Sequence, residues 1–78
     1  MAKYDPLRQL LDEAASPRVE VAFERIADLV GGLPRSATEH RAWWANDATH
    51  VHARAWLDSG FRVELVDLSG KRVRFVSV

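Results

Sequence analysis

Residues 40–56 read HRAWWANDATHVHARAW, and this stretch contains all three tryptophans and all three histidines of the 78-residue chain. Ala53, Trp56 and Leu57 recur at helical spacing, which predicts that Trp56 is buried on one face of a helix. Trp43 and Trp44 are adjacent, and neighbours on a helix diverge by about 100°. We therefore expect one of the two in the core. The other is expected to cover the helix junction or to contact a partner.

The histidines of this stretch do not form a metal-binding pattern. His50 and His52 are two residues apart, so a continuous helix points them about 200° apart. No histidine pair is spaced by four residues, and no nearby carboxylate completes a set of ligands with His40. We expect no metal and no cofactor. We expect these imidazoles to be exposed or locally hydrogen-bonded.

Two helices and a short strand are predicted before this stretch. Asp5 as N-cap and Pro6 as first helical residue start a helix, which Ser16-Pro17 ends. Alternating apolar residues then indicate a half-buried strand, and the spacing changes to helical at residue 23 or 24 until Gly31-Gly32. The elements are expected at residues 6–15, 19–22 and 23–30.

A third and a fourth helix are predicted around the tryptophans. Ser36 and Glu39 have the spacing of a capping box, which predicts a helix from Ser36 through the adjacent tryptophan pair. The residues that follow interrupt the helical pattern. Asp47 or Thr49 is expected to cap a fourth helix, which runs to residue 59 and ends at Gly60.

The C-terminal part has the pattern of a β-hairpin. Apolar residues alternate with charged ones at 61–65 and again at 72–75, and a loop around Ser69-Gly70 connects the two runs. The order helix–strand–helix–helix–helix–β-hairpin predicts one domain over residues 1–78. Its class is α+β, winged-helix-like, with a small antiparallel sheet. The additional helix leaves open whether the third or the fourth helix would be the recognition helix.

Composition excludes several classes of protein. The chain has no cysteine, so it has neither a disulfide nor a thiolate metal site. No apolar stretch approaches the length of a membrane span, and the charged N-terminal residues are unlike a signal peptide, so we expect a cytoplasmic protein with no membrane partner. No nucleophile motif or phosphate loop is present. We expect no enzymatic activity.

Charge is balanced overall but not along the chain. Eleven basic and eleven acidic side chains cancel. Residues 1–33 hold four basic against six acidic groups, whereas residues 34–78 hold seven basic against five acidic groups. An anionic partner would therefore contact the C-terminal part.

The first functional hypothesis is binding of double-stranded DNA. The hairpin would contact phosphates, and the start of the fourth helix would lie in the groove. The candidate residues are Arg35, Arg41, Asn46, Thr49, His50, Arg54, Lys71, Arg72 and Arg74. The same hairpin charges are also typical of a solvated strand face with ion pairs to Glu64 or Asp67.

The alternative hypothesis is a protein-interaction or homodimerisation module that does not bind nucleic acid. Neutral net charge, a free strand edge and one surplus tryptophan favour it, with Trp43 or Trp44 as the contact residue. A continuous positive stripe across Arg41, Arg54 and the hairpin arginines would favour DNA. Mixed signs would favour a protein partner.

Three stretches, YDPLRQLL, LPRSATEHRAWWAND and ARAWLDSGFRVELVDL, give the chain a pattern that resembles a small bacterial domain family of unknown function. The matching positions are Tyr4, Pro6, Leu7, Phe23, Ile26, Leu33, Pro34, Ser36, Ala37, Ala42, Trp43, Trp44, Asn46, Ala55, Trp56, Leu57 and Gly60. The resemblance covers nearly the whole chain and implies no known activity. It leans toward nucleic acid, because some members lie beside nuclease-like domains. Ala22 departs from the Ser or Thr of relatives, and Phe61 departs from their Trp.

Overall fold

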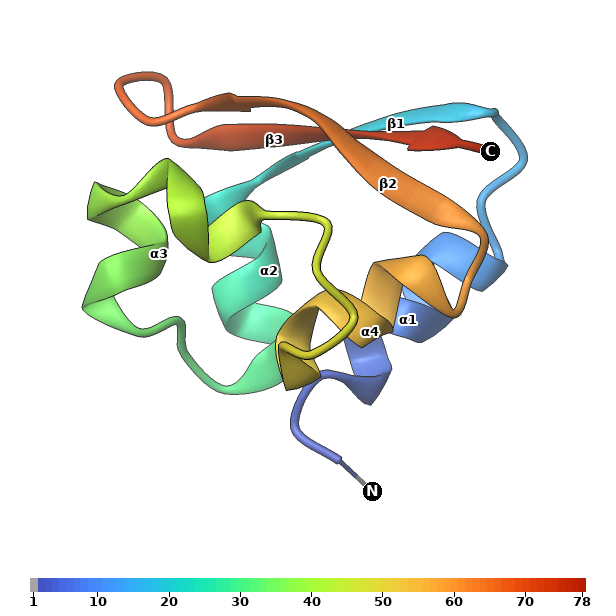
Figure 1. Ribbon diagram of the computed structural model, residues 1–78, viewed down its shortest axis with the longest axis horizontal. Helices are drawn as coiled ribbons and strands as arrows, with labels where there is room; N and C mark the ends of the chain where they lie inside the picture. Colours follow the sequence, from blue (N-terminus) through green and yellow to red (C-terminus); the bar gives the residue numbers. More distant parts are fainter. Residues whose placement is uncertain (1) are drawn as a thin grey trace.

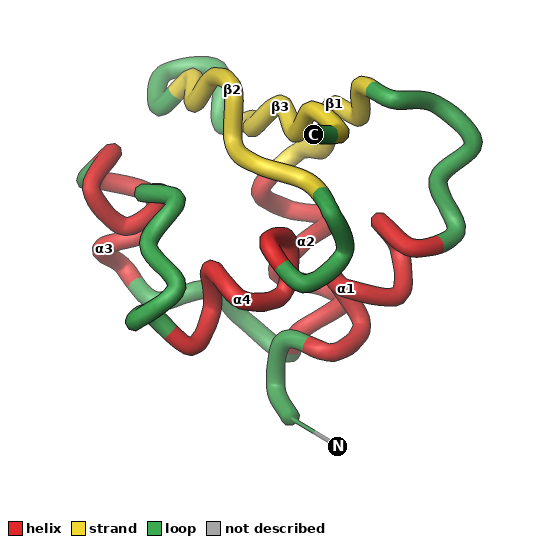
Figure 2. Tube along the Cα trace, turned by 45° about the vertical axis from the view of Figure 1, so that its right-hand side comes forward, coloured by secondary structure: helices red, strands yellow, loops and turns green. Residues whose placement is uncertain are grey.

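The computed structural model describes residues 2–78. Its elements are α1 (Asp5–Asp12), β1 (Arg18–Ala22), α2 (Phe23–Val30), α3 (Arg35–Glu39), the 3-10 helix η1 (Arg41–Trp44), α4 (Val51–Leu57), β2 (Phe61–Asp67) and β3 (Arg72–Ser77). All the helices lie on one side of a three-stranded sheet, so the molecule has two layers (Figures 1 and 2). The predicted α+β class is confirmed.

The sheet has the strand order β1-β3-β2, with β3 in the centre and antiparallel to both neighbours. β2 and β3 form the predicted hairpin, and the early strand β1 joins it with Val21 opposite Val73. The register between β2 and β3 shifts between Val63 and Leu65, which is a bulge at the outer strand. Because β3 is central, β1 and β2 are the two edges of the sheet.

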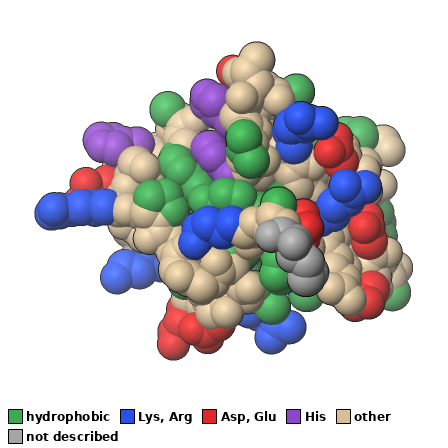
Figure 3. All heavy atoms as spheres, turned by 90° about the horizontal axis from the view of Figure 1, so that it is seen from below, with side chains coloured by type: hydrophobic (Ala, Val, Ile, Leu, Met, Phe, Trp, Pro, Cys, Tyr) green, Lys and Arg blue, Asp and Glu red, His purple; other side chains and the backbone are tan. Residues whose placement is uncertain are grey.

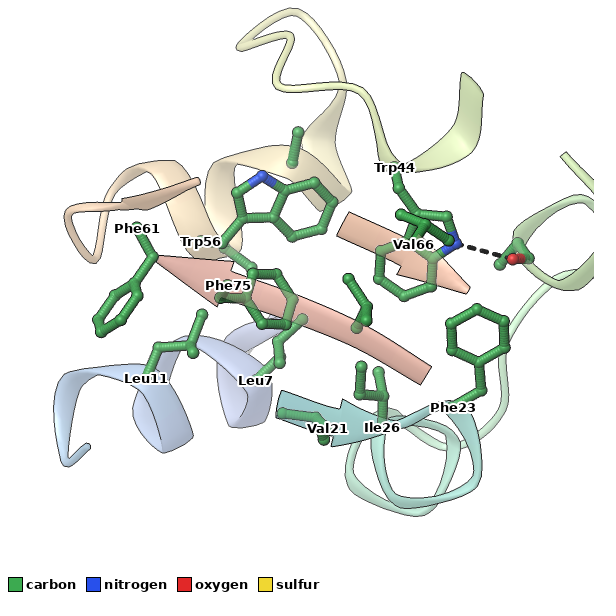
Figure 4. Packing of buried hydrophobic residues seen from close by; sticks show 14 of the residues in the cluster. Leu7, Leu11, Val21, Phe23, Ile26, Trp44, Trp56, Phe61, Val66 and Phe75 are labelled. Carbon is green, nitrogen blue, oxygen red and sulfur yellow. Dashed lines mark hydrogen bonds between the residues drawn. The ribbon is translucent and has the colours of Figure 1, made fainter. Parts of the chain in front are cut away.

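Aromatic rings fill the space between the two layers (Figure 4). Trp44 is 1% exposed, and Trp56 and Phe75 are completely buried. The ring of Trp56 lies 5.8 Å from that of Trp44 and 5.6 Å from that of Phe75, and Phe23 stacks on Trp44 at 5.1 Å. Rings of this size contribute much of the buried area in a small domain. The predicted burial of Trp56 is confirmed.

The predicted third helix is divided in two, and the indole of Trp44 explains the division. α3 ends at Glu39, and His40 is extended, with φ −129° and ψ 122°. In a continuous helix the Ala37 carbonyl would accept from the backbone N–H four residues later. Here it accepts from the buried Nε1 of Trp44 at 2.8 Å. The break therefore lets the tryptophan enter the core with its N–H hydrogen-bonded.

The predicted capping box at Ser36 is wrong. Pro34 occupies the N-cap position of α3, no side chain caps the helix, and Ser36 lies within it. The carboxylate of Glu39 accepts from Arg35 Nε at 2.8 Å instead of reaching back to Ser36. Because Pro34 is already extended, with φ −66° and ψ 155°, it takes the N-cap position, and the helix begins two residues earlier than the box requires.

The predicted caps of α4 are also wrong. The helix begins at Val51, with His50 as an N-cap whose side chain makes no capping bond. The Asp47 carboxylate accepts from the backbone N–H and the hydroxyl of Thr49, at 2.9 and 2.7 Å. Both bonds lower the pKa of Asp47, and the bond from the Thr49 hydroxyl has the larger effect. Asp47 thus stabilises the turn before α4 and not the helix itself.

The first two helices differ less from expectation. α1 includes Asp5 as its first residue, with Tyr4 in the N-cap position, and it ends at Asp12, three residues earlier than predicted. The Asp5 carboxylate accepts from the backbone N–H of Ala2 at 3.0 Å, so it caps the preceding turn. α2 ends as predicted, with Gly31 in the left-handed conformation at φ 78°.

Trp44→Phe is expected to destabilise the fold by about 2–4 kcal/mol, because it leaves a cavity and an unpaired Ala37 carbonyl. Trp43→Phe is the control. Since Trp43 is only half-buried, we expect a cost below about 1.5 kcal/mol. Urea unfolding of the three proteins measures the difference. Equal costs for the two variants would contradict the central position of Trp44.

Candidate functional site

The structure does not bring the candidate DNA-binding residues together on one surface. Lys71 lies in the hairpin turn (residues 68–71), beside α3, because Lys71 and Thr38 line the same hollow. Arg74 lies on the sheet, and Arg54 lies on α4 in the helical layer. The hairpin turn and α3 occupy one end of the molecule, and the start of α4 is remote from the turn (Figure 1).

The outer face of the sheet carries a chain of ion pairs of alternating sign. Arg18 contacts Glu64 at 3.3 Å, and Arg74 contacts the same carboxylate at 3.4 Å. Arg74 also contacts Glu20 at 3.6 Å, and Glu20 contacts Arg72 at 3.0 Å. These charges lie on all three strands, far apart in the sequence, so the full set of pairs could not be predicted from the sequence. The expectation of ion pairs to Glu64 is therefore met.

Asp67, the other expected partner of the hairpin arginines, has a local role. Its carboxylate accepts from the backbone N–H of Gly70 at 2.8 Å and from the Ser69 hydroxyl at 3.1 Å. These two bonds, the first being the stronger influence, hold the pKa of Asp67 below its usual range. Asp67 thus fixes the hairpin turn and so the position of Lys71.

Cations without an ion pair remain at the end of the molecule formed by α3, η1 and the hairpin turn (residues 35–44 and 68–71), which we call the α3 surface. Among residues 2–78, Lys3, Arg25, Arg41, Arg62 and Lys71 make no ion pair, and two of these five, Arg41 and Lys71, lie on the α3 surface. Arg35 is 88% exposed and contacts only Glu39. A hollow of about 310 Å³ between α2, α3 and the turn completes the surface.

The amide of Asn46 makes three hydrogen bonds within the fold. Its Nδ2 donates to the Val63 carbonyl at 3.0 Å, and its Oδ1 accepts from the Val63 N–H at 2.8 Å. The same Oδ1 accepts from Trp56 Nε1 at 3.0 Å. The side chain thus pairs with the outer edge of β2 as a neighbouring strand would, and three hydrogen bonds give it a structural role.

Trp43 and His52 form a second cluster beneath the core. Their rings stack with centroids 3.8 Å apart and planes 3° apart, and His52 Nε2 donates to the Trp43 carbonyl at 2.6 Å. The ring of Tyr4 lies 6.0 Å from His52, and that of His50 lies 5.3 Å away. Trp43 is therefore covered on one side by an imidazole, and Trp44 is the tryptophan that enters the core.

Burial lowers the pKa of His52, and the nearby His50 lowers it further, against the opposing influence of the Trp43 carbonyl. The fold thus favours neutral His52. His50 itself lies 4.0 Å from the Asp47 carboxylate, at the start of α4. Among residues 2–78, no three His, Cys, Asp or Glu side chains are grouped so that they could hold a metal ion.

The helical side of the molecule also shows mixed charge. Figure 3 views this side and shows Lys and Arg side chains interspersed with Asp and Glu, with hydrophobic side chains gathered beside histidines. Arg54 contacts Asp58 and Arg8 contacts Asp12, each at 3.8 Å. Carboxylates therefore interrupt the series Arg41, Arg54 and the hairpin arginines, so these residues do not form a continuous positive stripe.

None of the helices in residues 2–78 has the length and apolar character that a membrane span requires.

Residues 4–78 match the family model described as Domain of unknown function (DUF7662). The chain belongs to this family. No curated protein and no solved structure was found to match it. The family description names no activity, so membership agrees with the resemblance to an uncharacterised small domain family and assigns no role to any residue.

Asn46→Ala is expected to destabilise the fold by about 2–4 kcal/mol, because three hydrogen bonds are lost and Trp56 Nε1 is left without a partner. Thr49→Ala, which removes one exposed hydrogen bond, is expected to cost below about 1 kcal/mol. Chemical unfolding measures both. If Asn46→Ala left the free energy of unfolding unchanged, its assigned structural role would be wrong.

Stability is expected to fall with pH below the ordinary histidine pKa of 6.5, because the unfolded chain then binds a proton that folded His52 binds less readily. The contribution is fully present above that pKa and decreases as pH falls toward the lowered pKa of the folded state. Urea unfolding from about pH 8 to about pH 5 tests this. His52→Gln should flatten the profile, whereas His40→Gln, on an exposed residue, should reproduce the wild-type profile. An unchanged profile in His52→Gln would contradict the assignment.

Proposed function

We propose that this domain binds double-stranded DNA through the α3 surface, as a cytoplasmic winged-helix-like accessory domain without catalytic activity. The observation that carries the proposal is the position of the hairpin turn beside α3. The strand order β1-β3-β2 resembles that of a winged helix, in which a hairpin flanks a recognition helix, and the chain order resembles it apart from the additional helix between α2 and α4. The inference from architecture to DNA is an analogy of fold, so the residues must supply the chemistry.

The chemistry available on the α3 surface is that of phosphate contacts. Lys71 and Arg41 have no carboxylate to release before they bind a phosphate. Arg35 contacts only Glu39 in an exposed pair, and such pairs are worth about 0–1 kcal/mol, so a phosphate can replace the carboxylate. Arg72 adjoins the turn and can exchange Glu20 in the same way.

Candidates outside the α3 surface are assigned other roles in this proposal. Arg74, whose side chain is 35% exposed, is held between two carboxylates. Asn46 is bonded to β2 and Trp56. Thr49, His50 and Arg54 belong to the turn before α4 and to α4 itself, away from the hairpin turn. We therefore favour α3 over α4 as the element nearest the groove.

Affinity is expected to be modest, because Glu24 and Glu39 lie close to the proposed contacts. The four proposed phosphate contacts would give a salt slope of about −3.6, which is smaller in magnitude than the slope of a strongly basic DNA-binding protein. α3 has five residues, so it can present few side chains to base edges. Binding is thus expected to depend on phosphates more than on sequence.

The test is fluorescence anisotropy with labelled mixed-sequence duplexes at low salt. Lys71→Ala and Arg41→Ala are each expected to weaken binding about 3- to 10-fold and to reduce the salt slope by about one. Arg74→Ala and Arg54→Ala are matched controls that also remove one positive charge, and we expect less than about 2-fold change. Absence of binding at about 50 μM protein would refute the proposal, as would equal losses in all four variants.

A second candidate function is protein interaction without nucleic acid. The observation that favours it is the alternation of signs on the sheet face and on the helical side. Val51 is 72% exposed beside a small groove between α1 and α4, and Leu65 is 50% exposed on β2. A surface with charges of both signs can be complementary to a protein partner, whereas its carboxylates repel a polyanion.

A further inference from the structure

The two edges of the sheet differ in whether their outward backbone groups are covered. The outer edge of β2 is closed, because the Asn46 amide bonds both backbone groups of Val63 and the bulge at Glu64 interrupts the strand beyond it. Side-chain closure and bulges are ways in which proteins prevent an edge strand from pairing with another chain. The outer edge of β1 has neither device along its centre.

Backbone groups on β1 alternate between the sheet and the outer edge. Phe23 N–H donates to the Lys71 carbonyl and Ser77 N–H donates to the Pro17 carbonyl, so the odd-numbered residues 17–23 face β3. Glu20 therefore directs its N–H and C=O outward. Among residues 2–78, no hydrogen bond engages them there. Arg18 also faces outward, but its two backbone groups bond the Ser16 hydroxyl.

A hollow lies along this open edge. Its volume is about 570 Å³, and it is lined by the end of α1, the linker that follows and the start of β1. Leu10, Ala14 and Val19 give it apolar walls, while Glu13 and Glu20 supply charge at its rim. An approaching strand would therefore meet free backbone groups with space beside them.

We propose that the outer edge of β1 pairs antiparallel with the β1 edge of a second copy of this chain, centred on Glu20, to make one continuous six-stranded sheet. The proposal gives the homodimerisation alternative a specific surface, and it does not require DNA binding. In this register the two Glu20 residues exchange N–H···O=C bonds. The Ala22 N–H of each chain faces the Arg18 carbonyl of the other, which has a lone pair left after the Ser16 bond.

Charge complementarity favours a second copy as the occupant. The strand reads Arg18-Val19-Glu20-Val21-Ala22, so antiparallel pairing places each Arg18 diagonal to the Glu20 of the other chain. On the helical side, Val19 would lie opposite Val21 of the other chain. The facing Glu20 carboxylates repel each other, but each is held by Arg72 and Arg74 of its own chain.

The hollow also has room for the first turn of the second copy's α2. Because β1 begins next to the α1 linker and leads directly into α2, antiparallel pairing brings the first turn of one chain's α2 to the α1 end of the other. All the helices lie on the same side of the sheet, so this turn arrives where the hollow lies (Figures 1 and 2). If the β1 edge were covered here, the first turn of the second copy's α2 could not enter.

The experiment is sedimentation equilibrium of the full chain without DNA, from about 10 μM to about 1 mM, the range of weak association. We expect the mean mass of the wild type to rise toward that of a dimer. Glu20→Pro removes the outward N–H without removing a bond to β3, so it should remain monomeric. Glu20→Gln is the matched control, because it loses the same ion pairs and keeps the N–H. We expect it to associate at least as tightly as the wild type.

A second measurement keeps the test valid if Glu20→Pro does not fold, which circular dichroism would show. Hydrogen exchange of the wild type should slow at Glu20 and Ala22 as concentration rises, with no change at Val63, which Asn46 already covers. A wild type that stays monomeric at about 1 mM would overturn the proposal, as would equal association of Glu20→Pro. The anisotropy titration with DNA tests the α3 surface and not the β1 edge, so it fails or succeeds separately.

Discussion

The side chain of Asn46 is the constraint on which the arrangement of the two layers depends. One amide joins the loop after η1 to the edge of β2 through Val63 and to the helical layer through Trp56. The Trp56 indole is thus buried with its N–H hydrogen-bonded, as a core tryptophan requires. The neighbouring Trp44 meets the same requirement through the Ala37 carbonyl, which becomes available where α3 is broken. Two buried indoles therefore determine where the chain must leave regular helix.

This requirement explains which parts of the fold could be predicted from the sequence. Apolar periodicity predicted the hairpin, the early strand and the burial of Trp56, because burial of one face is the main determinant of those elements. The capping box at Ser36 was wrong because the N-cap of α3 is Pro34, two residues earlier. The length of the third helix was wrong because a tertiary bond from Trp44 competes with the helical bond to Ala37. Local patterns contain no information about such long-range partners.

The candidate site was harder to predict, for an electrostatic reason. The hairpin arginines gave the C-terminal part a basic count, yet their partners Glu20 and Glu64 come from different strands. Pairing across a sheet joins residues far apart in sequence, so the charge of a segment does not give the charge of a surface. Arg41 and Lys71 were named with the others, and only the structure separates them from the paired arginines. Asn46 was also a candidate DNA contact, although its amide bonds β2 and Trp56.

The small size of the domain also explains how the two edges of the sheet are protected. A chain of 78 residues has little material with which to cover strands, since a domain of this size buries only about 60% of its unfolded surface. At β2 a single amide replaces a covering strand. At β1 the protection consists of shortness and charge, with Arg18 and Glu20 on either side of Val19. These charges disfavour pairing with uncharged strands, whereas an antiparallel copy of the same sequence places each Arg18 diagonal to the other chain's Glu20. A device that prevents general aggregation can therefore select one specific partner.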